Sequence, residues 1–318
     1  MTSGLRVLVL AGSLVAVAVA VAVAAPTADP EASVVEALVS VTHSPGPAWW
    51  QVSNASSTVY VLGVPGAIPK GMAWDQSVVQ RRLQGANVVI LPPTVTAGVG
   101  DTAALIGLLG SLRSSTPMED GLPPALKARY QADRTRLPGD PRGYSHWLAA
   151  VAGLQIVGDW RKKLDLDAAE PAKTVRHLAS ADGVKTIPAG TYKAAPLFKA
   201  MASQAGPVGP ACVADALDEI EAGAAPIHAA AAGWARGDVR AALTEQRGYE
   251  KCANGFPEGA NITRVAVHDT AGAIGEALAK PGHSIAVVNL RALLAPGGVL
   301  QQLQARGFKI ARPDEVAD

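Results

Sequence analysis

Residues 48–93 constrain the fold more than any other stretch, because strand and turn signals alternate there at short intervals. Trp49-Trp50-Gln51-Val52 and Thr58-Val59-Tyr60-Val61-Leu62 are aromatic and β-branched runs, and the polar turn Asn54-Ala55-Ser56-Ser57 lies between them. Runs of this composition favour strands, and a short polar turn joins two of them as an antiparallel pair. The stretch therefore predicts a β-hairpin.

The second strand leads into a loop at residues 63–71, where glycine and proline recur without a helical pattern. Asp75 is placed to cap a following helix, and Gly85 to end it. A buried strand at residues 87–91 comes next, and Pro92 ends it because proline has no N–H for a sheet ladder. Strand, helix and strand in this order predict an α/β domain.

The C-terminal part repeats the alternation, with a helix at 262–279, a buried strand at 284–288, a helix at 299–306 and a last strand at 308–310. Between about residues 94 and 260 the pattern is mostly helical. We therefore predict an α/β (α+β) fold, in which a central β-sheet from both ends of the chain is covered by helices from its middle. The middle elements that we expect are helices at 101–112, 125–134, 144–164, 174–181, 195–203, 211–222, 227–236 and 238–244, and a strand at 184–188.

Several side chains of the middle region have simple structural interpretations. The helix that begins at Asp101 is apolar on most sides, which predicts burial. Arg161-Lys162-Lys163 lies in a last helical turn, where basic residues suit the helix dipole. We expect Trp234 to pack in the core and Asp238 to be the N-cap of a helix; the alternative is that this segment takes part in catalysis. A further helix is expected to turn its acidic residues to solvent, namely Asp215, Asp218, Glu219 and Glu221.

The first 24 residues predict a cleaved signal peptide. Arg6 supplies a positive charge, residues 7–25 are an apolar run, and Ala22-Val23-Ala24 fits the small-x-small cleavage rule. The alternative is an uncleaved anchor in the inner membrane formed by residues 6–25. We expect an exported protein, periplasmic or extracellular, with residues 25–47 as a tether to a domain at 48–318.

The two cysteines fit export, because an oxidising compartment allows Cys212 and Cys252 to form a disulfide. Closing a loop of this length would stabilise the fold by about 4 kcal/mol in the chain-entropy model. Two free buried thiols are the alternative. A redox or metal pair is disfavoured because Cys-x-x-Cys spacing is absent from the sequence.

Composition and motifs exclude several functions. Only 17% of the residues are charged and the net charge is +1, so no bulk field favours nucleic acid or an anionic membrane. The six histidines include no pair at i, i+3 or i, i+4, and His-Glu-x-x-His does not occur. The sequence also lacks a Gly-x-Ser-x-Gly elbow and a phosphate-binding P-loop.

The two hairpin segments, Ala48 to Ser53 and Ser57 to Gly63, resemble sequences of the TraB/GumN family, and so does the run Gly85-Ala86-Asn87-Val88-Val89-Ile90-Leu91. This family is similar to the TIKI proteases and, more distantly, to erythromycin esterase-like folds. Trp234 to Asp238 and the pattern from Ala286 to Phe308 extend the resemblance over roughly residues 48–312. The resemblance implies a divalent-metal site formed by Gly-x-x-His after the second strand, Glu after the buried strand, and a second His near the C-terminal helix.

At these family positions the chain has Gly66, Pro92, and Arg291 or Ala292. We therefore assign no metal ligand and no catalytic residue, and predict a degenerate, non-catalytic (pseudoenzyme) binding or assembly factor of the bacterial envelope. No cofactor is expected; the alternative is a metal-dependent hydrolase or protease that uses manganese or zinc on peptides or surface polymers. The partner is an envelope protein or small ligand rather than nucleic acid, and the membrane is contacted only through an uncleaved N-terminal segment. The residues that we expect around a cleft are Gly63, Gly66, Lys70 and Arg291. Arg291 is expected to bind an anion there, or alternatively to form a surface salt bridge.

Overall fold

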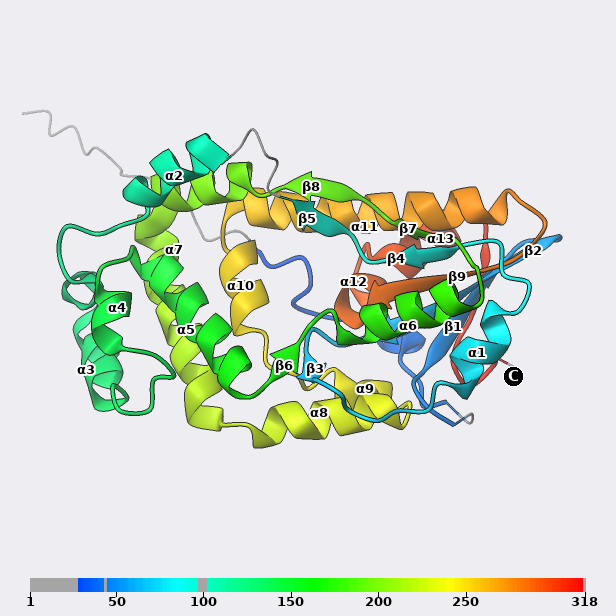
Figure 1. The fold of residues 1–318 in the computed structure, drawn as a ribbon, viewed down its shortest axis with the longest axis horizontal. Coiled ribbons are helices and arrows are strands. Elements are labelled where there is room, and N and C mark those ends of the chain that lie inside the picture. Colours follow the sequence, from blue (N-terminus) through cyan, green and yellow to red (C-terminus); the bar gives the residue numbers. More distant parts are fainter. Residues whose placement is uncertain (1–27, 43–44, 97–101, 317–318) are drawn as a thin grey trace, which may run out of the picture.

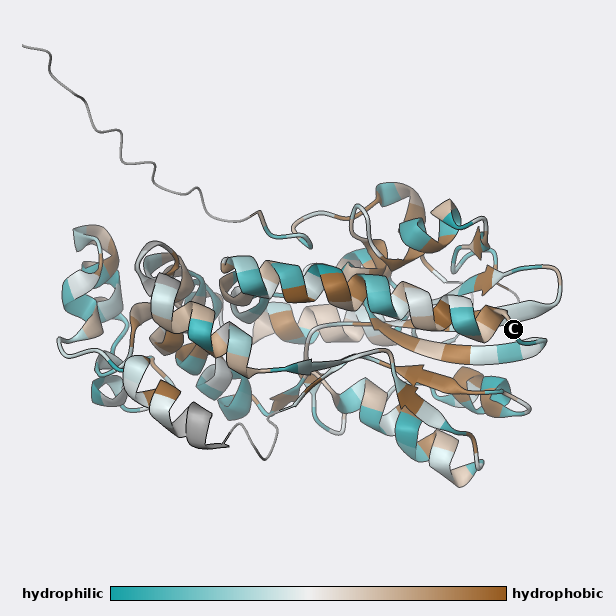
Figure 2. Ribbon diagram, turned by 90° about the horizontal axis from the view of Figure 1, so that it is seen from above, coloured by the Kyte–Doolittle hydropathy of each residue, from teal (hydrophilic) through white to brown (hydrophobic). Residues whose placement is uncertain are grey.

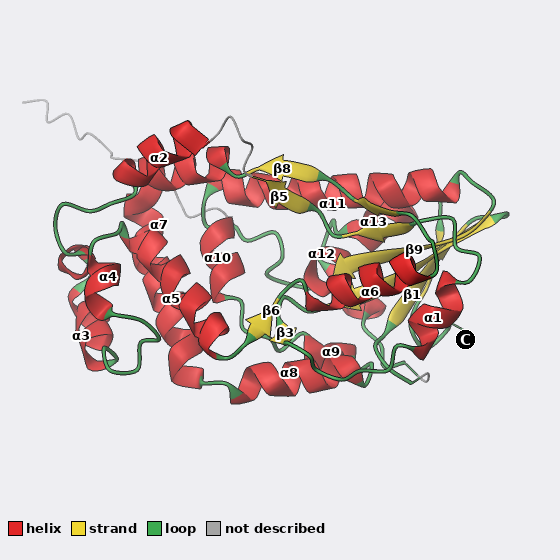
Figure 3. Cartoon of the chain, viewed as in Figure 1, coloured by secondary structure: helices red, strands yellow, loops and turns green. Residues whose placement is uncertain are grey.

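The computed structural model describes residues 28–42, 45–96 and 102–316. Strands gather at one end of an elongated molecule, and the helices of the middle region form the other end (Figures 1 and 3). Within these described ranges, no helix is both long and apolar enough to cross a membrane. The predicted signal peptide, and the alternative anchor at residues 6–25, lie outside the described residues.

The strands and helices are as follows. The strands are β1 (Trp49–Ser53), β2 (Ser57–Val64), β3 (Ile68–Pro69), β4 (Val89–Leu91), β5 (Thr94–Thr96), β6 (Leu166–Asp167), β7 (Thr186–Pro188), β8 (Thr191–Lys193), β9 (Gly282–Asn289) and β10 (Lys309–Ala311). The helices are α1 (Ser77–Leu83), α2 (Thr102–Ser111), α3 (Pro124–Ala132), α4 (Pro141–Ser145), α5 (Ala149–Lys163), α6 (Glu170–Ala181), α7 (Ala195–Ala222), α8 (Ala225–Ala235), α9 (Val239–Ala242), α10 (Gly248–Asn254), α11 (Pro257–Leu278), α12 (Leu290–Leu294) and α13 (Val299–Ala305).

Six of the described strands form one sheet in the order β10-β1-β2-β9-β4-β7, and the other four form two small pairs, β3 with β6 and β5 with β8. β1 is antiparallel to β2 and to β10, which confirms the hairpin, whereas β2, β9, β4 and β7 run parallel. The sheet therefore unites the two ends of the chain, as the sequence predicts, and β7 is the short strand expected from the middle region. Because β2, β9, β4 and β7 are parallel, their carboxyl ends share one edge of the sheet.

Both faces of the sheet are covered. Consecutive residues of β4 and β9 are buried, including Val89 to Leu91 and Ile285 to Val288, and this pattern is typical of strands with helices on both sides. Figure 2 shows hydrophobic residues along the strands, while the long helix α11 alternates hydrophobic and hydrophilic patches. The apolar core thus lies between the sheet and its helices, among them α1, α6 and α11.

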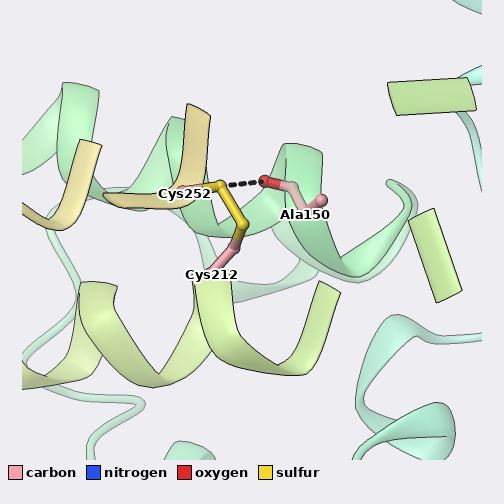
Figure 4. Close-up of a disulfide and its surroundings, with 3 residues drawn as sticks. All are labelled: Ala150, Cys212 and Cys252. Carbon is pink, nitrogen blue, oxygen red and sulfur yellow. Dashed lines mark hydrogen bonds between the residues drawn. A yellow bond between two sulfur atoms is a disulfide. The ribbon is translucent and has the colours of Figure 1, made fainter. Parts of the chain in front are cut away.

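The helical end is centred on the contact between α5 and α7. A Cβ on Gly153 of α5 would lie 2.6 Å from the backbone of Cys212, so the two helices approach closely only because that residue is glycine. The predicted disulfide is confirmed: Cys212 of α7 is bonded to Cys252 of α10, with 4.8 Å between their Cα atoms (Figure 4). The Ala150 carbonyl oxygen contacts Cys252 Sγ at 3.8 Å.

Two helix boundaries in this region differ from the prediction. The helix expected at 144–164 is divided into α4 and α5, because the backbone between them bonds to another segment: Leu148 N–H donates to Leu112 O, and Ser114 N–H donates to His146 O. Conversely, the helices expected at 195–203 and 211–222 form one helix, α7, despite Pro207 and Pro210. Packing against α5 outweighs the local preference to break a helix at proline.

Residues 28–42, which were expected to belong to a tether, are packed against the domain. Val35 N–H donates to Leu294 O, and the indole N–H of Trp50 donates to Leu38 O. Leu38 itself is buried in the sheet core. The described part of this segment is therefore a structural component of the domain rather than a free linker.

The other side-chain interpretations meet a mixed outcome. Asp238 caps α9 by accepting from Ala241 N–H, as predicted, and Trp234 is buried with its indole N–H on Gly63 O. In contrast, Leu109 of α2 is 48% exposed, so burial of that helix on most sides is wrong. The predicted solvated face is also wrong at one position, because Glu219 is buried.

Candidate functional site

A cavity of about 270 Å³ lies at the carboxyl edge of the sheet, where β4 and β9 end. We call it the edge cavity. Pro92, directly after β4, and Ala292 of α12, just after β9, form part of its wall. The ends of parallel strands are the usual place for a ligand site in an open α/β sheet. The lining residues are Glu31, Pro92, Pro93, Val95, Tyr192, Glu250, Ile262, Thr263, Ala266, Val267, Thr270, Val287, Val288, Asn289 and Ala292.

Gly66 follows the carboxyl end of β2 and faces two carboxylates. Its N–H donates to Glu245 Oε2 at 2.6 Å. A Cβ at this position would lie 3.3 Å from Glu245 Oε2 and 3.4 Å from Glu250 Oε1. Because Glu250 also lines the edge cavity, the positions Gly66, Pro92 and Ala292 border one region of the molecule.

Arg291 points into the protein. Its Nη2 donates to Leu243 O at 2.6 Å and its Nη1 to Glu31 O at 3.4 Å. Burial lowers the pKa of Arg291, and the nearby charge of Arg247 lowers it further. The guanidinium thus holds backbone carbonyls of two segments, and the roles expected for it, anion binding or a surface salt bridge, stay predictions.

The other two residues expected around a cleft do not line the edge cavity. Gly63 lies inside the core, where a Cβ would be 2.5 Å from Leu290 and 2.7 Å from Trp50. Lys70 is largely exposed and forms an ion pair with Asp165 at 2.8 Å. The first is a packing position and the second a surface pair. Gly66 and Arg291 do not line the cavity either, but they lie beside two residues that do, Glu250 and Glu31 respectively.

A group of buried and half-buried charges occupies the polar end of the edge cavity, and we call it the charge cluster. Arg161 donates to both oxygens of Glu250, at 3.1 and 3.0 Å, and lies 3.6 Å from Glu219. Arg247 bonds to Asp29 at 2.8 Å and to Glu31 at 3.2 Å. The members of the charge cluster are Asp29, Glu31, Arg161, Glu219, Glu245, Arg247, Glu250 and Arg291.

Burial and like charge shift the pKa values of this cluster. Burial, followed by the charge of Glu250, raises the pKa of Glu245 to about 7. Burial also raises the pKa of Glu31 and of Glu219. For Asp29, burial acts in the same direction, but hydrogen bonds from Arg247, Glu31 N–H and Asn254 together lower its pKa. Carboxylates outnumber guanidiniums in the cluster, so several acids compete for the same positive charge.

The donors at the edge cavity do not fit a divalent cation. Gly66, Pro92 and Ala292 offer no side-chain lone pair, and the guanidinium of Arg291 only donates. Of the described residues, only two carboxylates line the cavity, Glu250, which is bound by Arg161, and Glu31, which is bound by Arg247, whereas a metal site usually has three protein ligands or more. Among the residues that the structure describes, no three His, Cys, Asp or Glu side chains come together in a way that could hold a metal ion.

The sequence model of the TraB/PrgY/gumN family matches residues 48–312. The chain belongs to this family. The match spans β1 to β10, so it covers the whole sheet and the segments that border the edge cavity. No curated protein and no solved structure matches the chain.

Sequence reasoning missed most of the charge cluster of this TraB/PrgY/gumN protein. Arg161 was interpreted as a helix-end charge, and Asp29, Glu31, Glu245, Arg247 and Glu250 were not considered. One signal was present: Glu245-Gln246-Arg247-Gly248-Tyr249-Glu250 concentrates three charges in a chain with few of them. The pairing itself was hidden, because Arg247 meets Asp29 across 218 residues of sequence.

Proposed function

We propose that this TraB/PrgY/gumN protein is a non-catalytic binding or assembly factor of the bacterial cell envelope, and that it uses the edge cavity to bind a ligand. The observation that carries the proposal is the coincidence of three positions. Gly66, Pro92 and either Arg291 or Ala292 stand where the family resemblance implies metal ligands, and all of these border the edge cavity or its charge cluster. The cavity is retained while the donors are gone, which favours binding over metal-assisted hydrolysis.

Two features support a location outside the cytoplasm. The Cys212–Cys252 disulfide is of the kind that persists in oxidising compartments. The N-terminal apolar run with its small-x-small site supports export. We expect mass spectrometry of the exported chain to find a new N-terminus at Ala25 and an intact disulfide. A membrane fraction that retains residues 1–24 would instead support the anchored form.

Metal titration of three proteins tests the proposal. The wild type is compared with Gly66→His/Pro92→Glu/Ala292→His, which restores the family donors, and with Gly66→Gln/Pro92→Gln/Ala292→Gln, which adds bulk without imidazole or carboxylate. A Cβ at Gly66 would meet only side-chain ends, those of Glu245 at 3.3 Å and Glu250 at 3.4 Å, and no backbone, so the substitution requires these two carboxylates to shift by a few tenths of an ångström. We expect manganese, cobalt or zinc to bind with a stoichiometry near one ion per chain only in the first variant.

The outcomes separate the two functions. Stoichiometric binding of metal by the wild type, with hydrolysis that a chelator abolishes, would replace the proposal with the metal-dependent hydrolase. If the His/Glu/His variant folds and binds no metal, the three positions do not form the family's site. Metal binding by the wild type and by each variant is measured by calorimetry of the full chain, and thermal unfolding checks that each variant is folded.

A further inference from the structure

The edge cavity has mostly apolar walls. Ile262, Ala266 and Val267 of α11 form one side, and Pro92, Pro93 and Val287 line it from the ends of β4 and β9. A volume of about 270 Å³ is slightly below the usual range of small-molecule pockets, which begins at about 300 Å³. The walls therefore suit a small molecule with a short hydrocarbon or aromatic body.

The hydroxyl groups along the wall are already engaged within the protein. Thr263 donates to Asn254 Oδ1 at 2.7 Å, Thr270 to Ala266 O at 2.7 Å, and Tyr192 to Asp269 Oδ2 at 2.7 Å. The side-chain oxygen of Asn289 accepts from Arg291 N–H, which caps α12. Recognition of a ligand by these hydroxyl donors would cost the bonds that they already make.

Glu31 and Glu250 give the cavity its charged end. Each carboxylate is bound by one guanidinium, Glu31 by Arg247 and Glu250 by Arg161. A carboxylate has about four lone-pair sites, so each can accept a further donor. In the described part of the chain, the charge cluster contains five carboxylates (Asp29, Glu31, Glu219, Glu245, Glu250) and three guanidiniums (Arg161, Arg247, Arg291). Glu245, with a pKa of about 7, is partly protonated at neutral pH, and the four remaining carboxylates still outnumber the three guanidiniums, which favours a positively charged group.

We infer that the edge cavity binds a small organic cation, with its apolar body between α11 and the ends of β4 and β9, and its ammonium group against Glu31 and Glu250. The inference rests on the proposed function, because it assigns a ligand class to the same cavity. A primary ammonium supplies three donors and a positive charge, which complements the acceptor-only carboxylates. Burial of the hydrocarbon body adds affinity in proportion to its apolar area.

Three probes with the same six-carbon chain test the inference: hexylamine, hexanol and hexanoate. Calorimetric titration of the full chain at neutral pH is expected to show binding of hexylamine. Hexanol should bind at least about tenfold more weakly, since a charge-assisted hydrogen bond is lost. Hexanoate should be the weakest, because its charge repels the carboxylates.

Matched variants locate the two parts of the site. Glu250→Gln and, separately, Glu31→Gln should weaken hexylamine binding about tenfold or more and leave hexanol unchanged. Glu36→Gln is the control, since Glu36 is exposed and pairs with Arg240 outside the cavity. Ala266→Phe fills the cavity and should abolish binding of both, whereas Val265→Phe, on the exposed side of the same helix, should not.

Two results would overturn the inference. The first is hexanol or hexanoate binding as tightly as hexylamine; the second is hexylamine binding that Glu31→Gln, Glu250→Gln and Ala266→Phe all leave unchanged. Absence of binding by all three probes would also reject an organic cation. None of these results alters the metal titration or hydrolysis assays, so a failure of the inference is distinguishable from a failure of the proposed function.

Discussion

The sheet core and the charge cluster are built on different principles. The core consists of strands whose consecutive residues are apolar, and each strand is recognisable from its own few residues. The charge cluster consists of single charged residues that meet from five separate parts of the chain: residues 29–31, helix α5, helix α7, the segment 245–250, and Arg291. The sheet core thus depends on residues that are neighbours in sequence, whereas the charge of the cavity's polar end depends on ion pairs between residues that are far apart in sequence.

The largest effect is expected in the core. Trp50→Ala should lower the free energy of unfolding by about 4 kcal/mol, because the side chain is fully buried and its indole N–H donates to Leu38 O. The loss should be nearly the same at all pH values, since apolar burial has no titrating group. Denaturant unfolding at acidic and neutral pH measures it. If the free energy lost in Trp50→Ala varied strongly with pH, the sheet core would not differ from the charge cluster in its dependence on titrating groups.

The disulfide should rank second. It connects α7 to α10, and Cys252 is two positions from Glu250, so it holds an element of the charge cluster. Cys212→Ser/Cys252→Ser should lower the free energy of unfolding by about 3 kcal/mol, within the usual range for a loop of this length. Unfolding curves of oxidised, reduced and variant protein check this. Equal stability of the oxidised and reduced protein would contradict it.

A substitution in the cluster should have a smaller and pH-dependent effect. Arg247→Met removes the ion-pair partner of the Asp29 and Glu31 carboxylates. It should lower the free energy of unfolding by about 2 kcal/mol at neutral pH. Because Asp29 has a lowered pKa, its stabilising contribution is lost as the pH falls below its ordinary value of 3.8, and the difference from wild type should then shrink.

Arg240→Met is the matched control for this substitution. Arg240 pairs with Glu36 at the surface, where both side chains are more than half exposed. The expected change is below about 0.5 kcal/mol. If Arg247→Met were as mild as Arg240→Met, the pairing of Arg247 with residues 28–42 would not stabilise the domain.

A further pH-dependent effect concerns Glu245. Its pKa is about 7 in the folded chain and 4.5 ordinarily, so between these values the folded state holds a proton that the unfolded state releases. The free energy of unfolding should therefore fall as the pH rises through this window, by about 3 kcal/mol for a shift of this size. Glu245→Gln should remove this slope. The groups that face Glu245 are Glu250, Arg291, Arg161 and the N–H of Gly66. An unchanged slope would show that Glu245 titrates normally.

Much of the fold was predictable from sequence. The hairpin, the buried strands before Pro92 and at 284–288, the cap at Asp238 and the disulfide each depend on local signals or on a single pair of cysteines. The errors arose where distant backbone decided the outcome. Leu148 leaves the helical pattern because its N–H bonds to Leu112 O, and α7 continues past Pro210 because it packs against α5.

The candidate site was predictable only in part. The family resemblance pointed to Gly66, Pro92 and Arg291 or Ala292, but no local pattern brings Glu245 to Gly66 across 179 residues. Gly63, Gly66 and Lys70 were expected in one loop, yet Gly63 lies in strand β2 inside the core and Lys70 pairs with Asp165 at the surface. Side-chain direction in a loop depends on tertiary contacts that the sequence does not display.

The edge cavity is proposed to bind a ligand without hydrolysing it. The most direct measurement is hydrolysis of a peptide mixture by the purified full chain with manganese, cobalt or zinc, compared with the same assay in a chelator. The account predicts equal background rates for both conditions, because Gly66, Pro92 and Ala292 supply no metal donors. A metal-dependent rate that the chelator removes, and that Ala266→Phe also removes, would contradict it.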